Sequence, residues 1–378
     1  MKKIYFLTLL LLGMQAARAQ DAEGSADSND PGNTKFLLTG YAFMESAMSF
    51  ADGETHSNIE ATGFNPIFIW KKSDKLFFEG ELEVEAASSG YGKWATDVAL
   101  EYASMNYKVS KFLSFQAGKF LSPIGTFQER LHPAWINKLA SKPAGLGGAT
   151  RMQPGTEIGF SARGGVPMGG AKLNYIVWLS NGPVLNANGS LGYKNLADNN
   201  KGKALGGRIG LLPFSNSSLE IGVSEYTATV GTDGDQYYDG IGANIFALDF
   251  NFVKQVPGLK GIIDIKGQYN SVTVDDARYF TSPTDTEGYT FDNSSNTYYA
   301  QLAYRPTSVT GFVKNLELVG RYASLDFAET LGTDQNRFTL GLNYWLNWNS
   351  VVKLAYENID VSGQPSEQEL LLVVSFGF

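Results

Sequence analysis

The C-terminal segment, residues 367–378, constrains the fold of this chain more than any other stretch. Every second residue counted back from the end is apolar: Phe378, Phe376, Val374, Leu372 and Leu370. Soluble proteins rarely place such a strand at a free carboxylate. A transmembrane barrel accommodates it, because the last strand closes the barrel and its outer face contacts lipid. We therefore predict an all-β, antiparallel transmembrane β-barrel, with the strand ending in Phe378 engaging the barrel-assembly machinery.

The N-terminus has the features of a cleaved secretory signal peptide over residues 1–19. Lys2 and Lys3 precede an apolar stretch, and Ala17-Arg18-Ala19 is a small-x-small cleavage site. A membrane anchor is the alternative, but the apolar stretch has about eleven residues where a spanning helix needs about twenty. Residues 20–34 are rich in Asp, Ser, Asn and Gly and predict a flexible periplasmic lead-in. Residues 35–378 are then one outer-membrane barrel.

Composition excludes several classes of function. The chain has no Cys and two His, so disulfides, thiolate metal sites and three-His metal sites are excluded. The formal charge is −8, and −11 without Lys2, Lys3 and Arg18, which argues against a nucleic-acid partner. His56 and His132 fall in different predicted loops, so no general base has an evident partner. We predict no catalytic residue, no metal and no cofactor.

From residue 35 onward the apolar pattern has a period of two, as in half-buried strands. Leu340 falls on an apolar face and Thr339 on the opposite one, so Leu340→Arg should impair assembly and Thr339→Arg should be tolerated. Lys119 falls on an apolar face, which predicts a bulge or an earlier strand end. About sixteen strands are predicted, near residues 35–50, 61–70, 75–87, 95–108, 112–120, 155–163, 171–181, 202–212, 218–230, 238–252, 260–273, 297–305, 314–326, 336–346, 351–361 and 367–378.

The predicted connections alternate between two kinds. One set is short, and the other set contains every long connection, the longest being 121–154. A barrel with an even number of strands and both termini in the periplasm predicts this alternation, with short periplasmic turns and long extracellular loops. A soluble β-sandwich gives no reason for it.

A ladder of carboxylates lies on one face of the segment 75–87. Because four carboxylates cannot face lipid, they are predicted to line the lumen: Glu79, Glu81, Glu83 and Glu85. There they could pair with arginines across the pore or favour cations. The alternative is a solvated wall that is ion-paired to neighbouring strands for stability.

Basic residues of lumen parity form a second candidate set: Arg163, Arg208, Arg305, Arg321 and Arg337. A guanidinium offers a planar fork suited to phosphate and carboxylate oxygens, so these residues could guide anions. Acids such as Glu220, Asp249 and Glu317 share the same parity. Mutual neutralisation therefore stays open.

The long connection 121–154 is the third candidate, because a stretch of this length without alternation is usually functional. Glu129 is its one acid, and its basic residues are Arg130, His132, Lys138, Lys142 and Arg151. Folded into the barrel, it would narrow the pore and act as an electrostatic filter. The alternative is an external loop that packs Trp135 and Ile136 on the rim.

Two motifs and the glutamate ladder carry a family resemblance. Residues 118–125 (GKFLSPIG), followed by 130–133 (RLHP), resemble the fifth-strand and third-loop region of the phosphate-selective porin O/P family, as does the segment 77–85. The resemblance extends over residues 35–378 in architecture and implies a sixteen-stranded outer-membrane porin. The signal ending in Ala-Gln and the richness in Tyr and Asn suggest a Bacteroidetes-like Gram-negative source. It also implies an inward-folded third loop, passive transport of small anions, and a preference for anions or phosphate.

We therefore expect a passive diffusion channel for small hydrophilic solutes or anions. The expected surroundings are outer-membrane lipid and lipopolysaccharide. Porins of this size commonly form trimers, so a homotrimer stays open. Two alternatives are a non-conducting barrel that serves as adhesin or structural anchor and a secreted β-rich hydrolase. The predicted lipid-facing bands of Phe, Leu, Tyr and Ile argue against the hydrolase.

Overall fold

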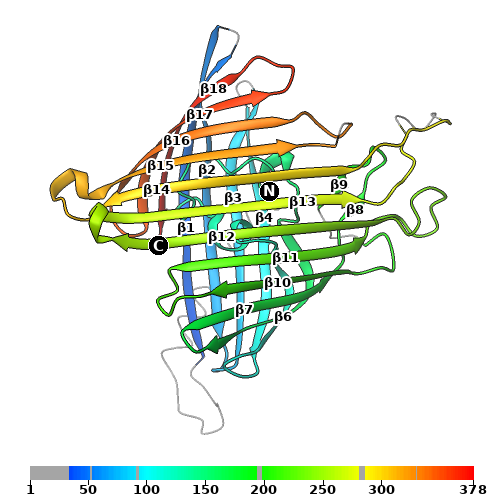
Figure 1. Ribbon diagram of the computed structural model, residues 1–378, viewed down its shortest axis with the longest axis horizontal. Coiled ribbons are helices and arrows are strands. Elements are labelled where there is room, and N and C mark those ends of the chain that lie inside the picture. Colours follow the sequence, from blue (N-terminus) through cyan, green and yellow to red (C-terminus); the bar gives the residue numbers. More distant parts are fainter. Residues whose placement is uncertain (1–33, 52, 91–92, 194–197, 281–285, 329) are drawn as a thin grey trace.

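The computed structural model describes residues 34–51, 53–90, 93–193, 198–280, 286–328 and 330–378, so the predicted signal peptide and nearly all of the lead-in lie outside the described residues. Sixteen strands form a closed antiparallel barrel (Figure 1), which confirms the predicted fold class and strand number. The barrel strands are β1 (Lys35–Ala51), β2 (Glu54–Lys71), β3 (Leu76–Gly90), β4 (Lys93–Lys108), β5 (Ser114–Leu121), β6 (Thr156–Met168), β7 (Ala171–Ser180), β10 (Ala204–Leu212), β11 (Leu219–Thr229), β12 (Gly242–Val256), β13 (Gly261–Val274), β14 (Ser294–Pro306), β15 (Leu316–Asp326), β16 (Gln335–Trp345), β17 (Ser350–Val361) and β18 (Glu367–Gly377).

The C-terminal strand closes the barrel against β1. Tyr41 pairs with Gly377 in this ladder, and beyond it the backbone N–H of Phe378 donates to the Gly40 carbonyl at 2.9 Å. The Phe378 ring stacks on Phe64 of β2, with ring centroids 5.5 Å apart. Gly40 has φ +152°, and a Cβ there would lie 2.3 Å from the Asn65 carbonyl oxygen, so this closure requires glycine. The terminal aromatic residue is thus part of the barrel seam.

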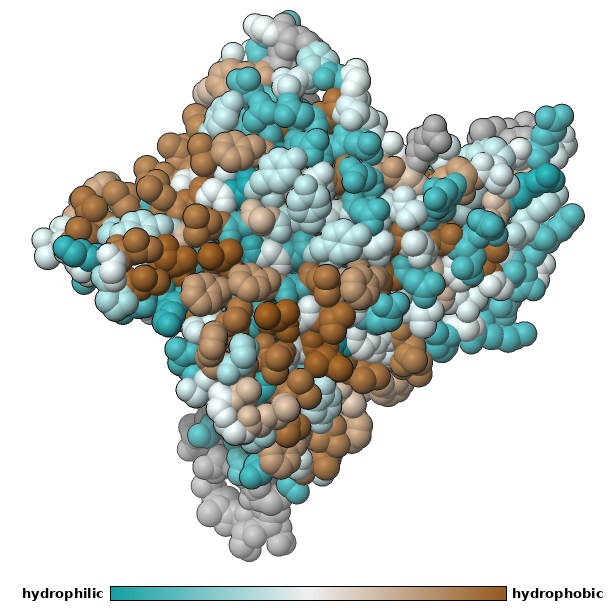
Figure 2. Space-filling view, viewed as in Figure 1, coloured by the Kyte–Doolittle hydropathy of each residue, from teal (hydrophilic) through white to brown (hydrophobic). Residues whose placement is uncertain are grey.

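Side chains alternate between an apolar outer face and a polar inner face. Leu340 is 50% exposed on the outside, whereas Thr339 is fully buried on the inside. Figure 2 shows apolar side chains gathered over the strands and hydrophilic ones over the loops at the right of the view. This is the pattern expected when the outer face contacts hydrocarbon and the inner face contacts water or polar groups.

Two hairpins extend further than the sequence predicts. The predicted strand ranges leave 51–60 and 88–94 as loops, but β2 begins at Glu54 and β4 begins at Lys93. The ladder between β1 and β2 continues to the pair formed by Ala51 and Glu54. The backbone hydrogen bonds of a hairpin do not require apolar side chains. A strand that extends into water therefore need not alternate apolar and polar residues, and this alternation was the signal used to predict the strand ends.

The irregularity expected near Lys119 lies in the neighbouring strand. The pairing of β3 with β4 shifts register between Glu81 and Leu82, which leaves Glu101 as the extra residue of β4. The ammonium of Lys119 donates to the Leu100 carbonyl at 2.5 Å, and β5 continues to Leu121. The bulge therefore accommodates Lys119 and turns Glu101 toward the interior.

Helices are few and short. The π-helical turn η1 (Phe127–Leu131) and the 3-10 turns η2 (Gly148–Thr150), η3 (Pro257–Leu259) and η4 (Gly311–Asn315) lie in connections, as does the small two-stranded sheet of β8 (Val184–Leu185) and β9 (Leu191–Gly192). None of the helices in the described part of the chain is long and apolar enough to cross a membrane.

One side of the barrel interior is filled by an apolar core. Phe127, Leu146 and Met152 of the connection between β5 and β6 pack against the inner wall, where Trp178 of β7 and Tyr226 of β11 are nearly fully buried. Phe127 meets the ring of Tyr299 of β14 edge-on, with centroids 5.9 Å apart. The connection thus lies inside the barrel, against the wall formed by β7 and β10–β15.

Candidate functional site

Two ionic contacts attach the connection 122–155, here called the inserted loop, to the wall behind it. Arg130 donates to Glu220 of β11 at 2.8 Å. Lys138 forms an ion pair with Glu317 of β15 and lies 3.4 Å from Asp264 of β13. These carboxylates are nearly buried, and the loop cations supply the compensating charge that buried carboxylates need. Two of the five loop residues predicted to filter solutes, Arg130 and Lys138, thus attach the loop to the wall.

Neutral groups complete the attachment. The side-chain oxygen of Gln268 accepts hydrogen bonds of 3.1 Å from the backbone N–H groups of Thr126 and Phe127. The ammonium of Lys353 of β17 donates to the carbonyls of Ala134 and Asn137. Contacts to β13 and β17 hold the loop backbone at widely separated points of the wall. Its position is therefore fixed by the fold.

The predicted lumen arginines face inward, but each has a partner. Arg208 is bonded to Asp249 at 2.7 Å and Glu220 at 3.0 Å, and Arg163 pairs with Glu129 of the loop. Arg321 and Arg337 both lie near Glu357, at 3.6 and 3.3 Å. Arg305 lies over the ring of Trp345, 5.6 Å from its centroid.

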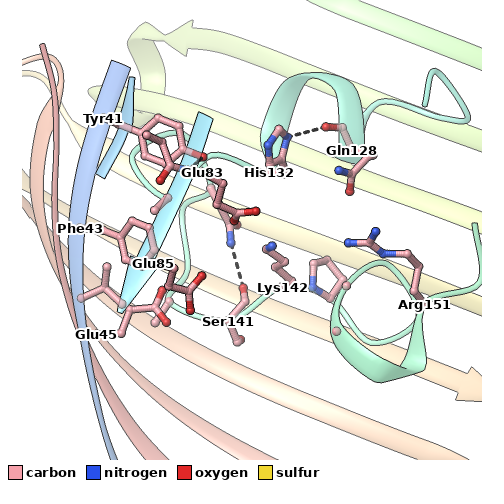
Figure 3. A pocket seen from close by; sticks show the side chains of 18 of the residues that line it. Tyr41, Phe43, Glu45, Glu83, Glu85, Gln128, His132, Ser141, Lys142 and Arg151 are labelled. Carbon is pink, nitrogen blue, oxygen red and sulfur yellow. Dashed lines mark hydrogen bonds between the residues drawn. The ribbon is translucent and has the colours of Figure 1, made fainter. Parts of the chain in front are cut away.

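An open cavity of about 800 Å³ remains on the other side of the loop. Figure 3 shows its two walls. Glu45 of β1 and Glu83 and Glu85 of β3 project from the strands, joined by Glu101 from the bulge in β4. Lys142 and Arg151 face them from the inserted loop. Arg337 of β16 and Lys353 of β17 also line the cavity, but Arg337 is paired with Glu357 and Lys353 is bonded to loop carbonyls. The cavity therefore separates carboxylates of β1, β3 and β4 from cations of the inserted loop.

Five of these charges have no partner within bonding distance. Within the part of the chain that the structure describes, Lys142 and Arg151 take part in no ion pair or hydrogen bond, and the same holds for Glu83, Glu85 and Glu101. The charge of Lys142 still acts on Glu85 and Glu101 across the cavity. The scaffold holds opposite charges near one another without letting them neutralise by contact.

The four glutamates of the ladder lie in two different environments. Glu79 accepts hydrogen bonds from Asn106 at 3.1 Å and from Gln116 at 3.4 Å, so it belongs to the polar lining of β3–β5. Glu81 is only 2% exposed and accepts from Asn65 at 3.4 Å. Glu83 and Glu85 border the cavity. Period-two parity groups all four residues but does not separate these two environments.

His132 is placed at the cavity edge but is not positioned to supply charge. His132 is 8% exposed, and its Nδ1 lies 2.5 Å from the Gln128 carbonyl, to which it donates. Burial, with the nearby Lys142 charge, lowers the pKa of His132 to about 4. The imidazole is therefore neutral at pH 7, and the basic side of the cavity consists of Lys142 and Arg151.

A second cavity of about 530 Å³ lies between the loop and β5–β7. Glu129, Arg130, Arg163 and Arg208 border it, and all four are ion-paired. Burial by itself would raise the pKa of Glu129, but Arg163 and Arg130 outweigh it and lower that pKa. No group of His, Asp or Glu residues in the described ranges is arranged to hold a metal ion.

Sequence reasoning missed two carboxylates of the cavity. Glu45 has the lumen parity of Tyr41 and Phe43, so alternation along β1 could have found it. Alternation could not assign Glu101 to the inner or the outer face. Because of the bulge in β4, counting from one end of the strand places Glu101 inside and counting from the other end places it outside.

Comparison with solved structures finds proteins of the same architecture. OmpF of Salmonella typhi, solved with daunomycin, matches 93% of this chain and 99% of its own at 13% identity, with a TM-score of 0.57. The fold is that of the outer-membrane porins. An anion-selective porin from Comamonas acidovorans matches 92% of this chain and all of its own (12% identity, TM-score 0.53). The channel DcaP of Acinetobacter baumannii matches 92% and 98% (13% identity, TM-score 0.53). No family model matches the sequence, and no curated protein matches it.

Proposed function

We propose that this protein is a passive diffusion channel of a Gram-negative outer membrane, for small hydrophilic solutes. The observation that carries the proposal is the charged cavity of about 800 Å³ between the inserted loop and β1–β4. It lies inside a closed barrel whose outer face is apolar and whose strand number leaves a water-filled lumen. The porin-like fold supports the same reading.

The inserted loop sets the aperture in this proposal. Its apolar side completes the core against β7 and β10–β15, so solutes pass on the side of the carboxylates. Selection requires no bond chemistry, because charge and width decide which solutes pass. A barrel that serves only as adhesin or anchor has no need of unpaired opposite charges lining an internal cavity.

A marked anion or phosphate preference is not part of the proposal. The arginines that could guide anions are paired with carboxylates or lie over Trp345. The partnerless charges at the cavity are two cations and three carboxylates, which leaves a small excess of negative charge. We therefore expect weak selectivity between small cations and anions.

Single-channel recording tests the proposal. The mature protein would be refolded in detergent and inserted into a planar bilayer, and the reversal potential measured across a KCl gradient. Steady ohmic conductance with a small reversal potential is the expected result. A folded, heat-modifiable, β-rich protein that gives no conductance would end the channel proposal.

Assembly into a homotrimer is part of the same proposal. One structure of similar fold, in vitro folded OmpT of Vibrio cholerae, is described as a trimer form (TM-score 0.53). Conductance steps that occur in groups of three, with a matching size in native gels, are the expected result. A monomer that conducts in single steps would remove the trimer and leave the channel.

A further inference from the structure

The charges at the cavity point to a class of solute. Lys142 and Arg151 lie on the loop side, and Glu83, Glu85 and Glu101 lie on the strand side, all with free side-chain termini. Unlike charges close together normally form ion pairs, which lowers the electrostatic energy of both. Here the loop is fixed by Lys138, Arg130 and its contacts to the wall, and in the described residues no ion pair joins the two sets.

A fixed separation of opposite charges produces a field across the cavity. A solute with one charge is attracted to one wall and repelled by the other. A solute with an amino group at one end and a carboxylate at the other is attracted to both walls when it aligns with the field. The guanidinium of Arg151 is not engaged by the protein, since its buried Nε has no hydrogen-bond partner among the described residues.

We propose that the cavity preferentially holds zwitterionic solutes of the amino-acid and short-peptide class. The carboxylate lies toward Lys142 and Arg151, and the ammonium lies toward Glu83, Glu85 and Glu101. This inference rests on the proposed channel function and adds the substrate class. The volume of about 800 Å³ accommodates such molecules together with water.

Four blocked and unblocked peptides of similar size provide the probes. Glycylglycine carries both charges, N-acetylglycylglycine only the negative one, glycylglycinamide only the positive one, and N-acetylglycinamide neither. Each is added to a conducting single channel at 0.1 M KCl, and the duration of current interruptions is measured. Glycylglycine should remain about fivefold longer than either singly charged peptide, which is the factor that one weak ion pair supplies.

Neutralising one wall at a time tests the field. Lys142→Gln with Arg151→Gln removes the two loop cations, and Glu83→Gln with Glu85→Gln and Glu101→Gln removes the three carboxylates on which the inference rests. Each set should reduce the glycylglycine duration to that of a singly charged peptide while conductance persists. Asp360→Asn, at the far end of β17, provides the matched control and should change nothing.

Inverting the field gives the sharpest comparison. In a variant with Glu83→Lys, Glu85→Lys, Lys142→Glu and Arg151→Glu, a zwitterion can turn round and should again remain longest. Loss of the preference on inversion, or equal durations for all four peptides in the unaltered channel, would overturn the inference. Absence of any conductance would instead contradict the proposed channel, so the two failures are distinguishable. Heat-modifiable mobility checks that each variant is folded.

Discussion

The hydroxyl of Ser141 in the inserted loop donates a 2.6 Å hydrogen bond to the carboxylate of Glu357 in β17. Glu357 is 1% exposed and also accepts from Thr339 at 2.6 Å. Arg321 donates to the Ser141 carbonyl at 3.0 Å and lies 3.6 Å from Glu357. One buried carboxylate therefore joins the loop to three strands of the wall.

Glu357→Gln should loosen the loop and destabilise the barrel. The substitution leaves the buried guanidinium of Arg321 without its compensating charge, and breaking a buried pair in this way costs about 3–5 kcal/mol. We expect a lower temperature of heat modification and added current fluctuations between substates. Asp360→Asn on the same strand is the control, because Asp360 is exposed. Unchanged thermal behaviour and quiet currents in Glu357→Gln would contradict this account of the anchor.

Leu340→Arg should impair assembly. Leu340 is half exposed on the outer face of β16, and an arginine facing lipid near the midplane costs about 2–4 kcal/mol. The yield of heat-modifiable barrel after refolding into lipid vesicles measures this effect. Glu85→Arg is the matched comparison, since it places the same side chain in the open cavity and should assemble normally. Equal yields for the two variants would show that the faces are assigned wrongly.

Thr339 shows how far alternation along a strand can be used. The two-residue period correctly places Thr339 inside and Leu340 outside, because the pleat alone decides the side. It also suggested that Thr339→Arg would be tolerated, but the structure has no room there, since Thr339 is fully buried and bonded to Glu357. Which inward residues meet water depends on the path of the inserted loop. That path is set by contacts between residues more than a hundred positions apart, such as Thr126 and Gln268.

The same limit applies to the charges of the site. The sequence identifies basic residues in the loop and arginines of lumen parity, but it does not show which of them will find partners. Arg130 and Lys138 form ion pairs with Glu220 and Glu317, whereas Lys142 remains without a partner among the described residues. The difference arises because Arg130 and Lys138 lie on the side of the loop that meets the wall. Because the loop sequence has no regular period, it does not indicate which of its side chains face the wall and which face the cavity.

Barrel stability should fall as the pH decreases from about 6.5 to 4 through His132. Burial lowers its pKa to about 4 in the folded protein, against about 6.5 when unfolded, so the unfolded chain binds the proton more readily in this range. The neutral imidazole thus contributes stability above pH 6.5 that is lost toward pH 4, by about 3 kcal/mol in full. Lys142 and Arg151 add to the effect because they repel the imidazolium.

Heat-modification temperature measured against pH tests this prediction. His132→Gln keeps a donor for the Gln128 carbonyl but cannot be protonated, so the decrease between pH 6.5 and 4 should be smaller in the variant than in the parent. The lowered pKa of Glu129 acts in the same direction, because the stability that Glu129 contributes is also lost as the pH falls. Glu129 is present in both parent and variant, so the difference between their profiles reports His132 alone. Identical pH profiles for parent and variant would remove His132 from this role.

Ion selectivity should respond to charges without partners and not to charges with them. Lys142→Glu combined with Arg151→Glu places two further negative charges beside Glu83, Glu85 and Glu101, so the reversal potential in a KCl gradient should shift clearly toward cations. Glu83→Gln with Glu85→Gln should shift it toward anions.

Arg208→Gln is the informative comparison for these variants. It removes one cation of the lumen wall, but this cation is neutralised by Asp249 and Glu220 and is almost fully buried. Its loss should lower the heat-modification temperature and leave the reversal potential near that of the parent, because the remaining carboxylates lie outside the open cavity. A shift in reversal potential as large as that of the Lys142 and Arg151 variant would mean that solutes also pass along β10–β12, and the aperture would have to be placed on both sides of the inserted loop.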